Sequence, residues 1–353
     1  MDTAQTPVVQ GNRLESASGR PLRLLGVDVS GTEDACIRHR AVSWGPDDPA
    51  EAAAIRAWGA NAVRVPLNED CWFGINGVQY GGPRYQRAIA SWVRTLNEAG
   101  LIAILDLHLA APGTQLADIQ WPMADATHGI GFWRTVAGVF RGDPSVVFDL
   151  YNEPFIGYYH PNDANWLCWR DGCTISFHGV RYRTAGVQQM LDAVRAAGAR
   201  QPVMVGGLNW AGDPCGVFDT GHTSGQACRW VAYKPEDPLH SLIVSIHIYD
   251  WTPCAPSACW HSVLSAAHVA PVVAGEFGEK LCSAQWEASF MNWADAHGIS
   301  YLAWSWTPVR QQASCSSGNL YLVRTWYGSL NRESPSGPAI LDHIERVRST
   351  RPS

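Results

Sequence analysis

The sequence has no run of about 18 or more apolar residues, so no segment is long enough to cross a membrane as a helix. It also has no cluster of Lys and Arg, because its 26 basic and 32 acidic residues are interleaved and leave a net charge of −6. This balance disfavours binding to nucleic acid. Charged residues make up only 16% of the chain and hydrophobic residues 46%, which favours a large core over a disordered tail. We expect a monomer that binds neither membranes nor nucleic acid.

The signatures of several enzyme chemistries are also missing. The chain has no H-E-x-x-H, G-x-S-x-G or G-x-x-x-x-G-K-[ST] motif, which argues against a zincin, a serine hydrolase of the elbow type and a P-loop enzyme. Asp125 and His128 could contribute to a metal site, but two such residues in a polar loop are more typical of ordinary surface. We therefore expect no cofactor and no metal.

The ten cysteines include no C-x-x-C pair, and a cytosolic enzyme rarely keeps so many thiols. The first residues, MDTAQTPVVQ, contain neither the basic nor the apolar region of a signal peptide. We expect a secreted, extracellular protein whose signal peptide has been replaced by the initiating Met. The alternative is a cytosolic enzyme with ten reduced cysteines.

Eight short apolar runs recur along the chain, and they are apolar on both faces, as strands covered on both sides should be. The runs are 22–29, 61–67, 102–109, 146–152, 202–210, 242–249, 271–277 and 300–306. Helical patterns lie at 49–59, 84–100, 180–198, 284–298 and 338–348, while 231–240 contains two prolines and is the weakest helix candidate.

Eight such repeats without a linker favour an α/β fold of the closed (β/α)8 barrel type. An open doubly wound sheet is the alternative, but the segment 26–34, GVDVSGTED, lacks the G-x-G-x-x-G loop typical of that fold. We expect a single catalytic domain over 1–353, with the barrel core at about 22–349 and a short N-terminal extension at 1–12.

Polar side chains gather at or near the C-terminal ends of these strands, where barrel enzymes build their active sites. They are Arg64, His108, Asn152, Glu153, His247, Tyr249, Glu276 and Trp304. We expect every cysteine to lie in a loop that follows a strand. Neighbouring loops and pairs within loops then give the disulfides Cys36–Cys71, Cys168–Cys173, Cys215–Cys228, Cys254–Cys259 and Cys282–Cys315, which would hold long loops on the catalytic face.

Two of the apolar runs end on a carboxylate. The stretch VVFDLYNEP (146–154) carries Glu153 and PVVAGEFGE (271–279) carries Glu276. A carboxyl group that is partly desolvated at a strand end has a raised pKa, as a general acid requires. Either residue alone could be a solvated or structural Glu. Two carboxylates facing one pocket, however, are the minimal set for glycoside hydrolysis.

These residues resemble glycoside hydrolase family 5, the cellulase-like retaining barrel enzymes, from about Leu22 to Trp306. The motifs that carry the resemblance are AVRVPL (62–67), LDLHLAAPG (105–113), LYNEP (150–154), SIHIY (245–249), AGEFGE (274–279) and GISYLAWSW (298–306). The resemblance implies that Glu153 is the acid/base and Glu276 the nucleophile. Arg64 and Tyr249 would hold Glu276 in its ionised form.

The same resemblance implies substrate contacts for four more residues. Asn152 would reach the sugar 2-OH, His108 and His247 would bind substrate or the carboxylates, and Trp304 would form the floor of the −1 subsite. Because His247 and Tyr249 are two apart on a strand, they share a face and can both point inward.

The chain contains 17 Trp residues, and aromatic faces can stack on sugars. Those in helical patterns should belong to the core. Trp residues near the strand ends are candidate subsite aromatics, namely Trp72, Trp121, Trp210, Trp251 and Trp306.

We expect a retaining β-glycoside hydrolase with two catalytic Glu, most similar to an endo-β-1,4-glucanase that acts on β-linked glucan. The carboxyl groups should then lie about 5–5.5 Å apart. An exo-acting β-glycosidase or diglycosidase, or a β-mannanase, could use the same residues. A non-catalytic carbohydrate-binding barrel is the alternative from another class, but it would have lost one of the two carboxylates.

Overall fold

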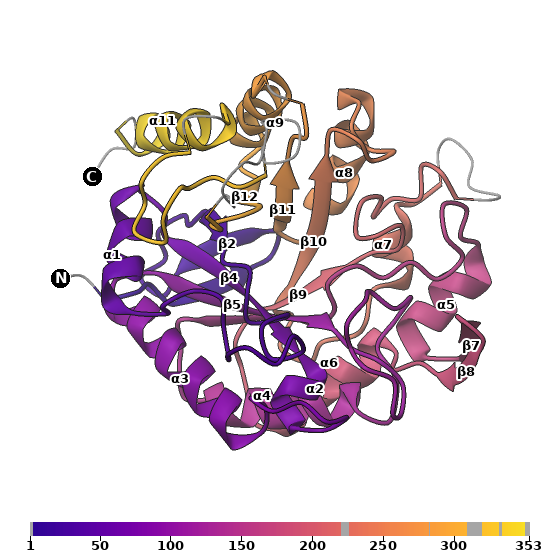
Figure 1. Cartoon of the computed structure of the whole chain (residues 1–353). Helices are drawn as coiled ribbons and strands as arrows, with labels where there is room; N and C mark the ends of the chain where they lie inside the picture. Colours follow the sequence, from indigo (N-terminus) through magenta and orange to yellow (C-terminus); the bar gives the residue numbers. More distant parts are fainter. Residues whose placement is uncertain (1–2, 220–225, 282, 309–319, 332–333, 350–353) are drawn as a thin grey trace.

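The computed structural model describes residues 3–219, 226–281, 283–308, 320–331 and 334–349. Eight parallel strands form a closed barrel in chain order, and the last strand pairs with the first (Figure 1). The strands are β3 (Leu25–Asp28), β4 (Ala62–Asn68), β5 (Ile102–Leu109), β6 (Val146–Asp149), β9 (Val203–Gly206), β10 (Leu242–Tyr249), β11 (Val272–Gly278) and β12 (Ser300–Ala303). Each strand overlaps one of the eight apolar runs, so the predicted α/β barrel is confirmed.

The helices surround the strands, as Figure 1 shows. They are α1 (Pro49–Ala57), α2 (Glu69–Phe73), α3 (Pro83–Glu98), α4 (Gly129–Phe140), α5 (Asp163–Asp171), α6 (Val187–Ala196), α7 (Arg229–Tyr233), α8 (Ser257–Ala267), α9 (Gln285–Ala296) and α11 (Ser336–Ser349). The segment with two prolines contributes only the end of the short helix α7, because Pro cannot continue a helix. No helix in these ranges is long and apolar enough to span a bilayer.

The expected helix at 180–198 is wrong in its first part. Residues Val180–Arg183 form strand β8, which pairs with β7 (Thr174–Phe177) in an antiparallel hairpin. Helix α6 begins only after Gly186, where a Cβ would lie 2.3 Å from the backbone oxygen of Arg170. The apolar spacing of a helix also begins only at Val187, since Tyr182 is the one buried side chain of β8.

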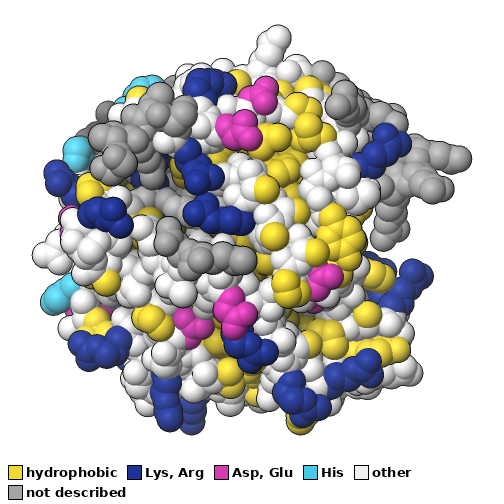
Figure 2. Space-filling view, turned by 90° about the vertical axis from the view of Figure 1, so that its left-hand side faces the viewer, with side chains coloured by type: hydrophobic (Ala, Val, Ile, Leu, Met, Phe, Trp, Pro, Cys, Tyr) yellow, Lys and Arg dark blue, Asp and Glu magenta, His cyan; other side chains and the backbone are white. Residues whose placement is uncertain are grey.

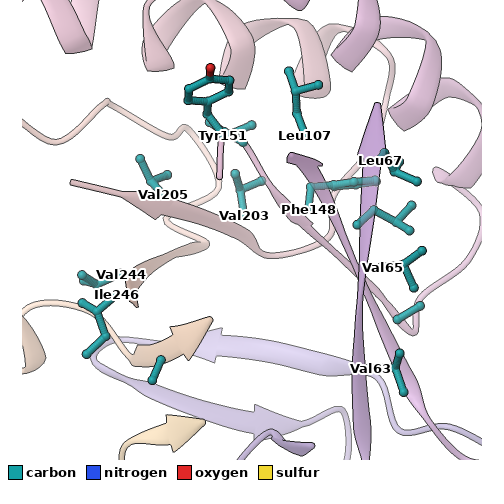
Figure 3. Close-up of a cluster of buried hydrophobic side chains, with 14 of the residues drawn as sticks. Val63, Val65, Leu67, Leu107, Phe148, Tyr151, Val203, Val205, Val244 and Ile246 are labelled. Carbon is teal, nitrogen blue, oxygen red and sulfur yellow. The ribbon is translucent and has the colours of Figure 1, made fainter. Parts of the chain in front are cut away.

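Two layers of buried side chains hold the barrel together. Residues that point outward from the strands pack against the helices, and Figure 3 shows part of this layer, including Val63, Val65 and Leu67 of β4. Because side chains alternate along a strand, Ala62 and Arg64 point into the barrel instead. Ala62 belongs to the inner core at the N-terminal ends of the strands, and Arg64 lies one level higher, nearer the C-terminal ends.

The N-terminal residues form part of this inner core. Strand β1 (Pro7–Gln10) pairs with β2 (Arg13–Ser16), and Leu14 of β2 packs with Leu22 and Leu24 against the inward residues of the barrel strands. The segment expected as a short extension therefore contributes to a hairpin that closes the N-terminal end of the barrel.

Four disulfides lie within the described residues. They are Cys36–Cys71, Cys168–Cys173, Cys215–Cys228 and Cys254–Cys259, which are the pairs expected from the sequence. The expected Cys282–Cys315 bond lies outside the described residues. The expectation that every cysteine lies in a loop is wrong, since Cys71, Cys168 and Cys259 belong to the helices α2, α5 and α8.

Figure 2 shows one face of the molecule, on which basic, acidic and apolar side chains are interspersed. Acidic and basic side chains are therefore interspersed on this face, as they are along the chain.

Candidate active site

A cavity of about 520 Å³ lies at the C-terminal end of the barrel. Its walls include six of the predicted site residues, namely His108, Asn152, Glu153, Tyr249, Glu276 and Trp304. The other two, Arg64 and His247, are fully buried and contact Glu276 from below. All eight predicted residues therefore meet in one place.

A bulge in β11 directs Glu276 toward this cavity. Ile246 of β10 pairs with Ala274, but the next residue, His247, pairs with Glu276, so Gly275 is the extra residue. A Cβ at Gly275 would lie 2.9 Å from the Ser245 hydroxyl and 3.2 Å from Nε2 of His247. Only glycine fits this close approach of the two strands.

Both carboxylate oxygens of Glu276 accept hydrogen bonds. Nη1 of Arg64 donates to Oε1 at 2.8 Å, and the Tyr249 hydroxyl donates to Oε2 at 2.5 Å. Burial and the charge of Glu276 raise the pKa of Tyr249 well above its usual value, so this phenol keeps its proton. The two donors stabilise the ionised carboxylate and fix its orientation.

Arg64 is surrounded by four carboxylates. Besides Glu276, it pairs with Asp28 at 3.1 Å, Asp106 at 3.1 Å and Asp149 at 3.0 Å. Burial alone would lower the pKa of Arg64, but these charges raise it well above the usual value. Burial also raises the pKa of Asp149 to about 7, although the charge of Arg64 opposes the shift. The Arg64 guanidinium is therefore the cation that compensates the four carboxylates at the base of the site.

These three Asp residues were not among the site residues predicted from the sequence. Each occupies an inward position on its strand, and the register pairs Asp28 with Arg64 and Asp106 with Asp149. The only sequence feature that could have indicated them is that each is a single Asp inside an otherwise apolar run, as in LGVDV, ILDLH and VFDLY.

Glu153 lies opposite Glu276, with 23% of its side chain exposed. Burial raises its pKa to about 7, while the positive charges of His108 and Arg64 oppose the shift. Nδ1 of His247 lies 3.1 Å from Oε1 of Glu153, and burial lowers the pKa of His247 to about 4. The neutral imidazole can therefore hydrogen-bond Glu153 without ionising it.

The separation of the two carboxylates is the central distance of the site. A carboxylate oxygen of Glu153, one of Glu276 and a ring nitrogen of His247 all lie within 4.8 Å of one another. Retaining glycosidases hold their two carboxyl groups about 5–5.5 Å apart, and inverting enzymes about 6.5–9.5 Å. The arrangement is therefore compatible with a double displacement.

The remaining predicted residues form the side of the cavity. Nδ1 of His108 lies 2.7 Å from Oδ2 of Asp106, and its ring stacks on Trp304 with centroids 5.5 Å apart. Burial alone would lower the pKa of His108, but Asp106 more than offsets it and the net shift is upward. Asn152 accepts from Nη2 of Arg64 at 2.9 Å and donates to Gln120 at 3.1 Å.

Two of the five candidate subsite aromatics line the cavity. Trp210 stacks on Phe155 with centroids 4.9 Å apart, and Trp251, 43% exposed, stacks on Tyr249 at 4.3 Å. The cavity also contains Tyr159, which the sequence analysis missed and whose ring lies 5.0 Å from that of Trp210.

The other three candidate aromatics are wrong, because their side chains are buried and cannot stack on a sugar. Trp72 packs against Tyr85 and Phe132. Trp121 packs against Phe177 and Tyr182. Trp306 packs against Trp58, and its indole N–H donates to the backbone oxygen of Trp326.

Asn209 is a further residue that the sequence analysis missed. It lines the cavity and is buried, and within the described part of the chain its amide makes no hydrogen bond of standard geometry, although it lies close enough to Asp213 to oppose the rise that burial causes in the pKa of that carboxyl. An amide in that state can both donate to and accept from a bound sugar.

Two groups of potential metal ligands near the cavity fit a metal poorly. Both oxygens of Glu276 already accept from Arg64 and Tyr249, although Glu276 could be grouped with Glu153 and His247. In the group of Asp213, Cys254 and Cys259, the two cysteines form a disulfide.

The chain is similar in sequence to several known proteins. The family model described as Cellulase (glycosyl hydrolase family 5) matches residues 16–309. A mannan endo-1,4-β-mannosidase of Streptomyces lividans is 26% identical over 306 residues, which are 84% of this chain and 68% of that protein. A protein of the same name from Cellvibrio japonicus is 25% identical over 304 residues, and the match covers 85% of this chain but only 58% of that protein.

Solved structures show the same fold. A β-glucanase of Saccharophagus degradans superposes with a TM-score of 0.70 at 19% identity, over 99% of this chain and 95% of that one. A β-mannanase of Thermomonospora fusca in complex with mannotriose gives a TM-score of 0.66 at 22% identity, over 99% and 98%.

Proposed function

The chain belongs to glycosyl hydrolase family 5 and is a glycoside hydrolase, and we propose that it cleaves internal β-1,4 bonds of mannan with retention of anomeric configuration. The observation that supports the mechanism is the short separation of Glu153 and Glu276, since one carboxylate oxygen of each lies within 4.8 Å of the other. This separation suits a carboxylate that attacks the sugar directly.

In the first step, Glu276 attacks the anomeric carbon and Glu153 gives its proton to the departing glycosidic oxygen. One C–O bond forms and one breaks, which leaves a covalent glycosyl-enzyme. In the second step, Glu153 takes a proton from water as the water attacks the same carbon, and Glu276 leaves. Arg64 and Tyr249 support this assignment because both donate hydrogen bonds to the carboxylate of Glu276. Burial raises the pKa of Glu153 to about 7, which suits a general acid.

The other residues of the cavity would position the sugar. Asn152 is held by Arg64 and Gln120, which orients its amide toward a 2-OH, where hydrogen bonds strengthen in the transition state. Trp304, backed by the ring of His108, would form the floor under the reacting sugar. Trp210 and Trp251 would stack on neighbouring units.

The choice of mannan differs from the glucan favoured in the sequence analysis. Both curated relatives described above are named as mannan endo-1,4-β-mannosidases. A third relative, from Caldicellulosiruptor saccharolyticus, is named β-mannanase/endoglucanase A and is 24% identical over 77% of this chain. The second candidate is therefore β-1,4-glucan, cleaved by the same residues.

The products formed from a panel of polymers test this function. Linear β-1,4-mannan, β-1,4-glucan and simple aryl glycosides would be compared at low conversion. We expect mannan to give oligosaccharides of several lengths at the earliest times, at a rate at least tenfold above that on glucan. Release of one short product from chain ends would contradict endo action. A faster rate on glucan would reverse the choice of substrate.

The pH profile tests the proposed acid. Since burial raises the pKa of Glu153 to about 7 and the acid must be protonated, kcat/KM should fall about tenfold per pH unit above that value. In Glu153→Ala, the residual activity on an aryl glycoside with a good leaving group should not show this alkaline fall. A wild-type rate that stays constant to pH 9 would exclude Glu153 as the acid.

We also infer that the protein is secreted, since four disulfides persist in oxidising compartments and are rare in the cytosol.

A further inference from the structure

Three side chains from separate segments meet at the rim of the barrel, outside the proposed active-site cavity. Glu69 is the first residue of α2, directly after β4, and His128 is the residue that precedes α4. Asp125 lies in the loop between β5 and α4. One donor atom of each residue lies within 4.8 Å of the donor atoms of the other two, and none of the three lines the cavity.

The distances from His128 to the two carboxylates do not correspond to direct hydrogen bonds. Nδ1 of His128 lies 3.7 Å from Oε1 of Glu69 and 3.5 Å from Oδ2 of Asp125. Neither Nδ1 of His128 nor Oδ2 of Asp125 has a hydrogen-bond partner. Ligand atoms bound at about 2.0–2.2 Å to a tetrahedral ion lie roughly 3.3–3.5 Å from one another, so the spacing suits three ligands of one ion.

The charges of the two carboxylates also favour a bound cation. The side chains of Glu69 and Asp125 are buried, and Oε2 of Glu69 has no hydrogen-bond partner. No Lys or Arg in the described ranges forms an ion pair with either residue, and His128 is the only basic group paired with them there. Two adjacent buried carboxylates are unfavourable unless a cation compensates them.

Both carboxylate oxygens of the neighbouring Asp70 already accept hydrogen bonds. Its Oδ1 accepts from Nδ2 of Asn76 at 2.9 Å, and its Oδ2 accepts from the backbone N–H of Ala117 at 2.9 Å. Among these four residues, the buried side-chain atoms without a hydrogen-bond partner therefore belong to Glu69, Asp125 and His128.

We propose that Glu69, Asp125 and His128 together bind one divalent transition-metal ion of the Zn²⁺ or Mn²⁺ class. A nitrogen ligand beside two carboxylates suits these ions better than Ca²⁺, which prefers oxygen ligands throughout. The side chain of His128 is 23% exposed, so the site can be reached from solvent.

The bound ion would have a structural role close to the active site. It would join α2, the loop between β5 and α4, and the start of α4. The same loop carries Gln120, whose side chain contacts the amide of Asn152 and the backbone oxygen of Glu153. The ion would therefore fix the position of this loop beside the cavity.

Metal binding by the chelator-treated full chain tests the proposal without reference to hydrolysis. Calorimetric titration with Zn²⁺ and, separately, with Mn²⁺ should show one ion per chain for at least one of them. Saturating metal should raise the Tm by on the order of 5 °C. Glu69→Gln and His128→Ala should each weaken binding at least tenfold, whereas His268→Ala, which removes an exposed histidine elsewhere, should bind as the wild type does.

Three results would overturn the proposal. One is that neither ion binds, and another is that both variants bind as tightly as the His268→Ala control. The third is that only Ca²⁺ binds. A wild type that binds no metal, together with a Glu69→Gln variant of higher Tm, would show that Glu69 holds a proton beside Asp125 instead of sharing an ion with it.

Discussion

Glu276→Gln is expected to lower kcat on the natural polymer by about 10³-fold or more, because an amide cannot form the covalent intermediate. The substitution keeps the shape of the side chain and an oxygen that can still accept from Nη1 of Arg64, which lies 2.8 Å away in the native site. The loss should therefore appear in turnover much more than in folding. Initial rates and the thermal unfolding midpoint would be measured on the same preparation.

Glu98→Gln provides the matched control, since Glu98 is an exposed residue at the end of α3 and this substitution should leave both rate and midpoint unchanged. If Glu276→Gln retained more than about a tenth of wild-type turnover while folded, Glu276 would not be the nucleophile.

Arg64→Met is expected to destabilise the protein by on the order of 3–5 kcal/mol, because removal of one partner leaves uncompensated buried charge. In this case Asp28, Asp106, Asp149 and Glu276 would lose their shared cation. The free energy of unfolding would be obtained from denaturant titration.

Arg38→Met is the matched control. Arg38 pairs with Asp34 on the surface, where 62% of its side chain is exposed, and such pairs contribute about 0–1 kcal/mol. The loss in Arg64→Met should also become smaller as the pH falls. Burial already raises the pKa values of Asp28 and Asp149 above their usual values, although Arg64 opposes the shift. Without the guanidinium these two pKa values should rise further, so protonation at lower pH stabilises the folded variant. Equal effects of the two substitutions at pH 7 would show that the carboxylate cluster does not depend on Arg64.

The sequence was sufficient to predict the barrel because its strands are buried on both faces. Apolar runs that are covered on both sides stand out even without knowledge of their neighbours, and all eight were found. The hairpin of β7 and β8 was missed because VRYR (180–183) lies next to a helical pattern. The structure places the start of the helix just after Gly186, which packs closely against the backbone of Arg170.

The residues that the sequence did not indicate are those whose role depends on closure of the barrel. Asp28, Asp106 and Asp149 surround Arg64 only because three strands place them at one level inside the barrel. Conversely, Trp72 follows a strand end closely but points into the core. Proximity to the rim along the chain does not give the direction of a side chain, which depends on the local backbone and packing.

The grouping of Glu69 with Asp125 and His128 could not be predicted from the sequence, for the same reason as the cluster of Asp residues. Glu69 is far from Asp125 and His128 along the chain, and only the packing of α2 beside α4 brings the three together.

The site of covalent attachment of a 2-deoxy-2-fluoro-β-mannoside with a good leaving group would test the double displacement most directly. We expect peptide mass spectrometry to find one fluorosugar per chain, on the peptide that contains Glu276, and none on the Glu276→Gln variant. Attachment to another residue would contradict the roles assigned to Glu153 and Glu276. The same holds if the enzyme is not labelled but still cleaves mannan and releases products of inverted configuration.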